Sequence, residues 1–232
     1  MLEIKNLNAF YGHSRALRGV NAKVRKGGFL TLLGRNGVGK TTFLRAVLGL
    51  MDRSDGEIIL DGAPIDGLPT HRRARAGIGY VPQGRGILPT FTVRENLKLG
   101  TFARSNGGGQ EIDDTVFDLF PMLKDFLDRP GGNLSGGQQQ QLAIARAMLT
   151  HPKVILLDEP TEGIQPNLVE LIEEAILSLN KKFGITIILV EQDIAFARRA
   201  SDMFAIMEKG QIVADGPVGE LTDELVHKHM AI

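Results

Sequence analysis

The chain has 232 residues, of which 43% are hydrophobic and 23% are charged, and this length suits one large globular domain or one domain with a sub-lobe. Lys and Arg number 27, as do Asp and Glu, so the formal net charge is zero and the broad basic surface of a nucleic-acid binder is not expected. The absence of cysteine excludes disulfides and cysteine-ligated metals and fits a reducing compartment.

The first residues, 1–5, have the pattern of a strand and lack the basic and apolar segments of a signal peptide. The longest apolar runs, such as 187–190, are far shorter than the roughly 18 residues that span a bilayer. We therefore expect any membrane role to depend on a partner.

Five short segments have strand patterns. Residues 2–7 and 56–60 alternate apolar and polar side chains, which predicts strands buried on one face. Residues 29–33, 154–157 and 186–190 are nearly continuous apolar runs, which are typical of strands buried on both faces of a sheet.

A helix is predicted between the last two strands, with Pro166 near its start and Gly184 after its end. A strand, a helix and a strand in this order predict a βαβ crossover and a parallel sheet. The residues expected on one face of the helix are Leu168, Leu171, Ile172, Ala175, Ile176 and Leu179.

Residues 85–149 show no strong strand pattern, and we predict a helical sub-lobe there. Thr92 and Glu95 have capping-box spacing, and a helix over 116–120 is expected to stop at Pro121. Residues 105–109 are predicted to form a flexible loop. Near the end of the chain, 203–207 and 211–215 flank a hairpin-like turn.

A complete phosphate-binding loop pattern, GRNGVGKT, follows the predicted strand 29–33 and precedes a helix over 41–48 with Gly49 as its expected cap. Glycines let successive backbone N–H groups surround phosphate oxygens, and the helix N-terminus adds partial positive charge. Lys40 is expected to reach the β- and γ-phosphates, and the Thr41 hydroxyl is expected to bind Mg²⁺. The alternative is a glycine-rich turn that binds nothing.

The buried run 154–157 ends in Asp158 and Glu159, at the strand end where open α/β sheets place ligands. We expect Asp158 to hold Mg²⁺ through water and Glu159 to act as general base for the attacking water. The alternative is two acids that cap the next turn before Pro160.

The sequence LSGGQ over 134–138 precedes a long helical pattern, and Ser135 with Gln138 has capping-box spacing. The start of this helix is a second potential anion site, but the chain has one phosphate-binding loop. A partner molecule's ATP would supply the missing phosphate. The alternative is an ordinary helix cap.

These motifs, with Gln83 after a strand, occur in an order that resembles the ABC ATPase family over essentially the whole chain. The resemblance implies a P-loop NTPase (RecA-like) α/β core with an antiparallel β subdomain, over 1–84 and 150–232, and an inserted helical signature subdomain over 85–149. It implies head-to-tail dimers that hold each ATP, with Mg²⁺, between one subunit's P-loop and the other's LSGGQ signature.

The resemblance also assigns roles. Tyr11 would stack on adenine; the alternative is an aromatic on the sheet surface. Gln83 would contact Mg²⁺ and water and report to the membrane subunit; the alternative is a polar loop residue. Ser135 and Gly137 would contact the γ-phosphate of the opposite ATP. The expected nucleotide contacts are Tyr11, Gly34, Arg35, Asn36, Gly37, Val38, Gly39, Lys40, Thr41, Thr42, Gln83, Ser135, Gly136, Gly137 and Gln138, and the expected Mg²⁺ ligands are Thr41, Gln83 and Asp158.

Two positions depart from the family pattern. Gln192 stands where the family has a histidine that contacts the γ-phosphate, and Gln165 stands where the loop after the catalytic acid often ends in aspartate. A glutamine amide can donate to phosphate but cannot titrate. We expect Gln192, Lys40 and Glu159 to be the catalytic residues. Either the pair is asymmetric, with a histidine in a sister subunit, or glutamine supports full hydrolysis.

Within the family, the phrases at 81–85 and 190–192 look like the branched-chain amino-acid and urea importer subunits, and the segments 34–42, 132–141 and 159–166 are similar to the urea-type second ATPase. The resemblance implies ATP-driven import of a small polar solute, urea first and branched-chain amino acids as the alternative.

The expected partners are a second ATPase subunit, two transmembrane permeases and, indirectly, a solute-binding protein, at the cytoplasmic face of the plasma membrane. The apolar stretch 86–91 would either touch a permease or, as we favour, pack within the sub-lobe. A non-transport ABC ATPase acting on ribosomes or DNA, or an inactive structural subunit, remains a rival.

Overall fold

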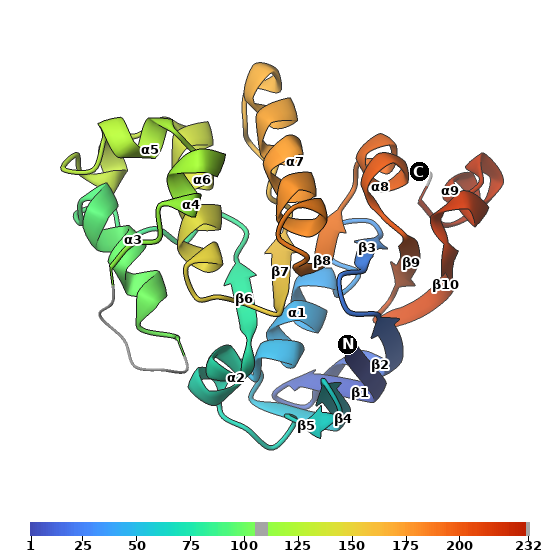
Figure 1. Cartoon of the computed structure of the whole chain (residues 1–232). Coiled ribbons are helices and arrows are strands. Elements are labelled where there is room, and N and C mark those ends of the chain that lie inside the picture. The colour runs from blue at the N-terminus through green and yellow to red at the C-terminus, as the bar shows by residue number, and fades with distance from the viewer. Residues whose placement is uncertain (105–110, 231–232) are drawn as a thin grey trace. The chain divides into compact units, whose positions relative to one another are not determined.

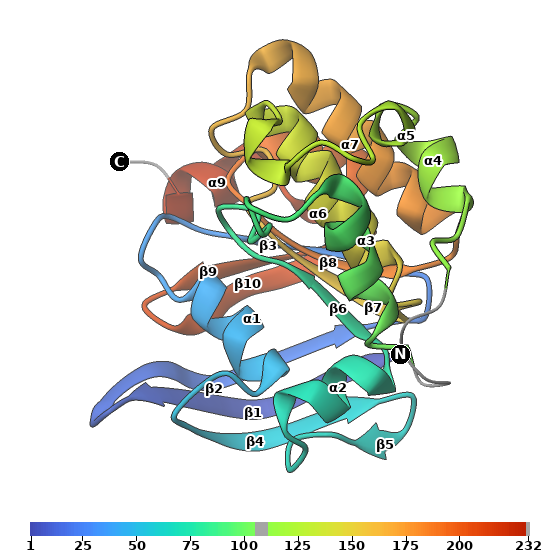
Figure 2. The same cartoon turned by 90° about the vertical axis from the view of Figure 1, so that its left-hand side faces the viewer.

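A computed structural model describes residues 1–104 and 111–230, and the loop predicted over 105–109 lies outside them. The chain forms two compact units, Met1–Arg73 with Thr186–Ile232 (unit 1) and Ala74–Ile185 (unit 2). Figures 1 and 2 show their elements in two views. In the ranges given, no helix has both the length and the apolar character needed to cross a bilayer. The subdomain bounds expected from the sequence remain a prediction.

Unit 1 contains an antiparallel sheet in the order β2-β1-β4-β5, on which helix α1 lies (Figure 2). Leu2 pairs with both Val24 and Leu60, and all three side chains are buried. The two strands predicted from alternation are confirmed as parts of longer strands. The bounds are β1 Leu2–Tyr11, β2 Ser14–Val24, β4 Arg53–Leu60, β5 Ala63–Pro64 and α1 Lys40–Leu48.

A second sheet segment of unit 1 has the order β10-β9-β3-β8, in which β3 runs parallel to both β8 and β9. Every residue of β3 and β8 is buried, as their continuous apolar runs predicted. The predicted hairpin is confirmed, and Lys209 and Gly210 form its turn with φ of 44° and 77°, the left-handed pair of a type I′ turn. The bounds are β3 Phe29–Leu33, β8 Thr186–Glu191, α8 Ile194–Ala200, β9 Met203–Glu208, β10 Gln211–Pro217, η2 Val218–Glu220 and α9 Asp223–Met230.

The C-terminal end of α1 is held by Arg73, from α2 (Thr70–Ala76). The residue is 3% exposed, and its guanidinium donates to Ala46 O at 3.0 Å, Val47 O at 2.8 Å and Leu68 O at 2.8 Å. Burial lowers the pKa of Arg73 from its ordinary value. The side chain therefore satisfies carbonyl groups that a helix end leaves without intrahelical partners.

Unit 2 contains the parallel pair β6-β7 and a group of helices (Figure 1), and α6 contacts α3, α5 and α7. The capping box of Thr92 and Glu95 starts α3 as predicted, and the described residues between 85 and 149 contain no strand. Helix α4 ends just before Pro121, also as predicted. The bounds are β6 Ile78–Val81, α3 Val93–Thr101, α4 Thr115–Leu119, α5 Met122–Asp125, η1 Gly131–Asn133, α6 Gly136–Met148, β7 Val154–Asp158 and α7 Pro166–Lys181.

The predicted buried face of α7 needs one correction. Ile172 and Ile176 are buried, but Leu171 is 42% exposed, while Glu173 is buried. At about 100° per residue, the buried stripe is turned toward Glu173 and leaves Leu171 at its outer edge. Helical spacing located the helix, but it did not fix the rotation of the helix.

Candidate nucleotide and catalytic site

The loop between β3 and α1 has the backbone of a phosphate cradle. Gly34, Gly37 and Gly39 have φ of 151°, 79° and 113°, a region that favours glycine. A Cβ on Gly34 would lie 2.6 Å from Met207 O, so a side chain does not fit there. Gly39 is the N-cap of α1 and supplies no side-chain cap, which leaves the first amides of the helix to another acceptor. The loop therefore fits a phosphate ligand.

Lys40 lies across this loop. Its Nζ donates to Gly34 O at 2.7 Å and to Arg35 O at 3.1 Å, and the residue is 4% exposed. Thr41 follows at the first turn of α1 and is partly buried. An ammonium group held over the loop is of the kind that binds phosphate oxygens, and its contact with the β- and γ-phosphates remains a prediction.

Tyr11 ends β1 beside the same helix. Its hydroxyl lies 3.4 Å from Thr42 Oγ1, and the residue is 45% exposed. An exposed aromatic face next to a phosphate loop suits stacking with a base. The stacking role remains a prediction.

Gln192 follows the end of β8 and contacts the loop directly. Its Nε2 donates to Asn36 Oδ1 at 2.8 Å, and both residues are exposed. Its backbone N–H donates to Oε2 of the buried Glu191 at 2.9 Å. The contact of Gln192 with the γ-phosphate, which the family resemblance implies, remains a prediction, and the bond to Asn36 was not predicted.

In unit 2, Asp158 is the last residue of β7 and Glu159 follows it directly. Asp158 is fully buried, and Tyr80 Oη donates to its Oδ2 at 3.3 Å. Glu159 is 8% exposed and has φ of 45°, a left-handed conformation that costs a non-glycine residue about 1–3 kcal/mol. Strain of this kind is often kept at functional sites, which is consistent with the predicted catalytic role of Glu159.

Gln83, two residues after β6, is also in unit 2. Its Nε2 donates to Glu162 Oε2 at 2.7 Å, and both side chains are exposed. The sequence singled out Gln83 but not Glu162 or Tyr80, because nothing in the spacing relates them to Gln83 and Asp158.

The LSGGQ segment starts α6 with a reciprocal capping box, as its spacing predicted. Ser135 N donates to Gln138 Oε1 at 2.9 Å, and Gln138 N donates to Ser135 Oγ at 3.4 Å. A Cβ on Gly137 would lie 2.5 Å from Leu168 Cδ1, so the Leu168 side chain would have to move to accept a larger residue. Ser135 is exposed, and its hydroxyl hydrogen can still be donated to an external acceptor. The segment is a helix cap, and anion binding there remains a prediction.

The described residues contain no group of three or more His, Asp or Glu side chains that could hold a metal ion. Mg²⁺ is usually bound by one or two carboxylates together with substrate phosphates, and its binding here remains a prediction. Asp158 and Thr41 supply a carboxylate and a hydroxyl of the expected kinds, in unit 2 and unit 1 respectively.

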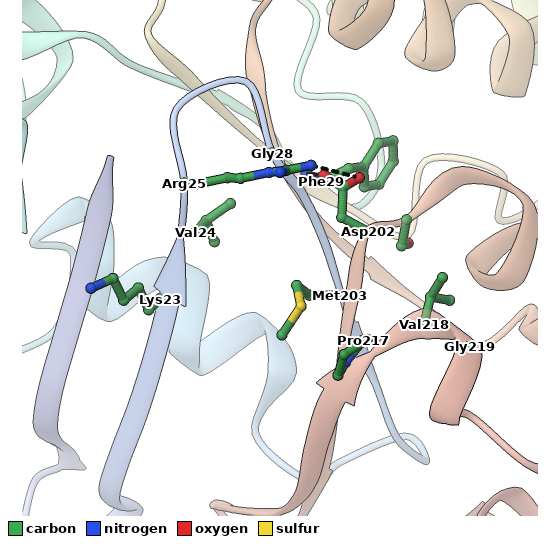
Figure 3. A pocket seen from close by; sticks show the side chains of 11 residues that line it. Lys23, Val24, Arg25, Gly28, Phe29, Asp202, Met203, Pro217, Val218 and Gly219 are labelled. Atoms are coloured by element: carbon green, nitrogen blue, oxygen red, sulfur yellow. Dashed lines mark hydrogen bonds and ion pairs between the residues drawn. The ribbon is translucent and has the colours of Figure 1, made fainter.

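A separate pocket of about 650 Å³ lies in unit 1 at the start of β3, the opposite end of this strand from the phosphate loop (Figure 3). The ion pair of Arg25 NH2 and Asp202 Oδ1, at 3.2 Å, lies at this pocket. No residue of the phosphate loop lines it, so it is distinct from the candidate nucleotide site. Its lining residues are Lys23, Val24, Arg25, Gly28, Phe29, Ser201, Asp202, Met203, Pro217, Val218 and Gly219.

Residues 17–162 match the model of the ABC transporter family. The high-affinity branched-chain amino acid transport ATP-binding protein BraG of Pseudomonas aeruginosa is 39% identical, over 92% of this chain and 91% of its own length. The probable branched-chain amino acid transport ATP-binding protein LivF of Archaeoglobus fulgidus is 36% identical, over 96% and 94%.

Among solved structures, the ADP conformation of the ATP-binding cassette MJ1267 has a TM-score of 0.84 at 29% identity, covering 98% of this chain and 97% of that one. A dimeric post-hydrolysis state of the cassette MJ0796, bound to ADP and Pi, has a TM-score of 0.82 at 29% identity, covering 94% and 99%. The α/β fold predicted for a P-loop ATPase is therefore confirmed.

The fold and the phosphate loop define an ATPase of the ATP-binding cassette class. The chain belongs to the ABC transporter family, as an ATP-binding subunit whose hydrolysis of ATP is coupled to transport.

Proposed function

We propose that two ATPase subunits, this chain and a second cassette, pair head to tail and drive import of a small polar solute. The observation that supports this proposal is the exposed cap of α6 at Ser135, a potential anion site in a chain whose sequence has one phosphate-loop motif. A partner's triphosphate gives that site its ligand. The solved dimer of the similar cassette MJ0796 supports such pairing.

In the proposed site, Lys40 and the loop amides bind the phosphates and Tyr11 stacks on the adenine. Glu159 accepts a proton from the attacking water, and Gln192 donates to the γ-phosphate. Mg²⁺ neutralises charge on the β- and γ-phosphates, and the residues proposed to hold it are Thr41, Gln83 and Asp158.

The remaining proposed contacts belong to the phosphate loop and to the signature of the partner. Backbone N–H groups of the loop surround the phosphates, and the hydroxyl of Ser135 donates to the γ-phosphate of the opposite ATP. The loop residues are Gly34, Arg35, Asn36, Gly37, Val38, Gly39 and Thr42, and the signature residues are Ser135, Gly136, Gly137 and Gln138.

A membrane subunit is the proposed partner of the apolar side chains near Gln83. Leu88 and Phe91 are 38% and 40% exposed, so the packing within the sub-lobe that the sequence favoured does not bury them. Leu99 and Phe102, from α3 and its C-cap, are also exposed. Exposed apolar groups of this kind are typical of protein contacts. Two permeases, and through them a solute-binding protein, would place the ATPase at the cytoplasmic face of the membrane.

The proposed solute is urea, because the segments 34–42, 132–141 and 159–166 are similar to the urea-type second ATPase. Branched-chain amino acids are the second candidate, since BraG and LivF carry that function in their names. None of the residues in these segments touches the solute, so the choice depends on family analogy.

Uptake by the assembled transporter tests the proposal. Cells or vesicles that contain both ATPases and the permeases are given labelled urea or labelled leucine, with Lys40→Ala as the inactive control. We expect ATP-dependent uptake of urea that the Lys40 variant abolishes. Uptake of leucine without uptake of urea would identify branched-chain amino acids, not urea, as the solute. Co-purification of the protein with nucleic acid instead of membranes would overturn the proposed role in import.

Single-turnover hydrolysis by the pair, with the phosphate-loop lysine of each subunit changed in turn, tests whether the two sites are equivalent. We propose an asymmetric pair in which the site with Gln192 is the slower one. Equal loss from both sides would contradict the asymmetry and favour full hydrolysis with glutamine.

A further inference from the structure

The contact between Gln83 and Glu162 joins two segments of unit 2. Gln83 Nε2 donates to Glu162 Oε2 at 2.7 Å, although the residues are 79 positions apart. Glu162 N also donates to Glu159 O at 3.2 Å, which closes a turn directly after the end of β7. A chain of two hydrogen bonds therefore leads from the segment after β6 to the backbone of Glu159.

The chemistry of the pair fixes the orientation of the Gln83 amide. An ionised carboxylate has no proton and only accepts, so the amide must turn its nitrogen toward Glu162. The amide oxygen is bonded to the same carbon and therefore faces away from the carboxylate. Mg²⁺ takes oxygen ligands, so this orientation leaves the atom that a metal needs available.

Burial does not hold the amide in place, because both side chains are exposed. Without Glu162, water can hydrogen-bond either end of the amide, and the two flipped orientations become similar in energy. A charge-assisted bond is about twice as strong as a neutral one, so Glu162 selects one orientation even in contact with solvent.

We infer that Glu162 is a positioning residue for Gln83, which holds the amide nitrogen on its carboxylate, leaves the amide oxygen for the metal-ligand role proposed for Gln83, and links Gln83 to the turn that carries Glu159. The inference rests on the proposed role of Gln83 and adds a residue to that site. Glu162 does not itself contact the nucleotide in this scheme. It acts through the glutamine.

The test is a Mg²⁺ titration of nucleotide binding to the full chain. A fluorescent, non-hydrolysable ATP analogue is held at fixed concentration while Mg²⁺ is varied, so hydrolysis is not part of the readout. We expect Glu162→Ala to raise the Mg²⁺ concentration for half-maximal binding about three- to tenfold, the effect of losing one hydrogen bond between solvent-exposed side chains. Binding in EDTA should stay the same.

Glu162→Gln should give a smaller shift, because a glutamine there can either accept from or donate to the Gln83 amide. Glu170→Ala is the matched control, since it removes an exposed carboxylate of the same unit. It should leave the titration unchanged. In a Gln83→Ala background, Glu162→Ala should have no further effect.

Three results would overturn the inference: an unchanged titration in Glu162→Ala, an equal shift in Glu170→Ala, or a full additional shift in the Gln83→Ala background. The last two would indicate a general effect of charge. If the unaltered chain and its assembled complex bind no nucleotide at any Mg²⁺ concentration, the proposed function itself fails. Thermal melting of each variant shows whether the fold is retained.

Discussion

The side-chain amide of Gln192 donates to the Asn36 side chain at 2.8 Å, which joins the residue after β8 to the phosphate loop 156 positions earlier. The bond holds a neutral donor at the edge of the loop. A histidine at this place could carry a positive charge near neutral pH, whereas a glutamine cannot.

We predict that Gln192→Ala slows single-turnover hydrolysis at this phosphate loop about tenfold or more, because a positioned donor to the developing phosphate charge is lost. Asn36→Ala removes the contact but keeps the donor, so its effect should be smaller, about threefold. Rapid-quench measurement on the assembled pair distinguishes the two. Full activity in Gln192→Ala would show that this donor is not used.

Gln192→His tests how a titratable side chain at this position affects the binding of ATP. Free histidine titrates near pH 6.5, so the variant should acquire a pH dependence of the KM for ATP between about pH 6 and 8 that the unaltered protein lacks. Below its pKa the imidazolium attracts phosphate, and KM should therefore fall as pH falls. The same pH profile in both proteins would show that this side chain does not approach the nucleotide.

Local patterns predicted the parts of the site that depend on neighbours in sequence. Glycine spacing located the phosphate loop, and the Thr92 and Ser135 capping boxes marked the starts of α3 and α6, because a cap involves residues three positions apart. The strand ending in Asp158 was equally clear from its apolar run. These features result from short-range chemistry that a single sequence displays.

Contacts between distant residues were not predictable in the same way. Glu162 meets Gln83 and Arg73 meets Ala46 only because the folded backbone brings these residues together. No rule of sequence spacing predicts either contact. The exposure of Leu88 was also missed, because an apolar run does not tell whether it packs inside its own domain or against a partner.

Ser135 caps α6 and is also proposed to contact phosphate, and substitutions can separate these two roles. We predict that Ser135→Ala lowers the free energy of unfolding by about 1 kcal/mol through loss of the cap and also abolishes most ATPase activity of the assembled pair. Ser135→Asp keeps a good cap, but it places a negative charge toward the γ-phosphate. It should therefore fold normally and lack activity.

Thr92→Ala is the matched control, since Thr92 caps α3 with the same reciprocal box and has no proposed nucleotide contact. It should lose similar stability and keep its activity. Chemical denaturation and a phosphate-release assay give both quantities. Activity in Ser135→Asp equal to that of the unaltered pair would argue against a phosphate at this cap.

Glu159→Gln separates hydrolysis from binding. A glutamine cannot accept the proton of the attacking water, so we predict a fall in turnover of about 10²–10⁴. The triphosphate should remain bound, and chromatography of the variant should recover ATP. Asp158→Asn should instead weaken Mg²⁺-dependent binding. If Glu159→Gln hydrolysed ATP at the normal rate, the base would have to be another residue.

Arg73 provides a test of the fold that does not involve the nucleotide. Arg73→Ala removes the guanidinium donors from the carbonyl groups of Ala46, Val47 and Leu68, of which Ala46 O keeps the Gly49 N–H, and we predict that the free energy of unfolding falls by about 2–4 kcal/mol. Arg73→Lys keeps the charge but loses the planar fork, so its loss should be intermediate. Arg72→Ala, at an exposed neighbour, should change stability by less than about 0.5 kcal/mol. Urea denaturation of the three variants measures these differences, and equal midpoints for Arg73→Ala and Arg72→Ala would show that water replaces the guanidinium at the end of α1.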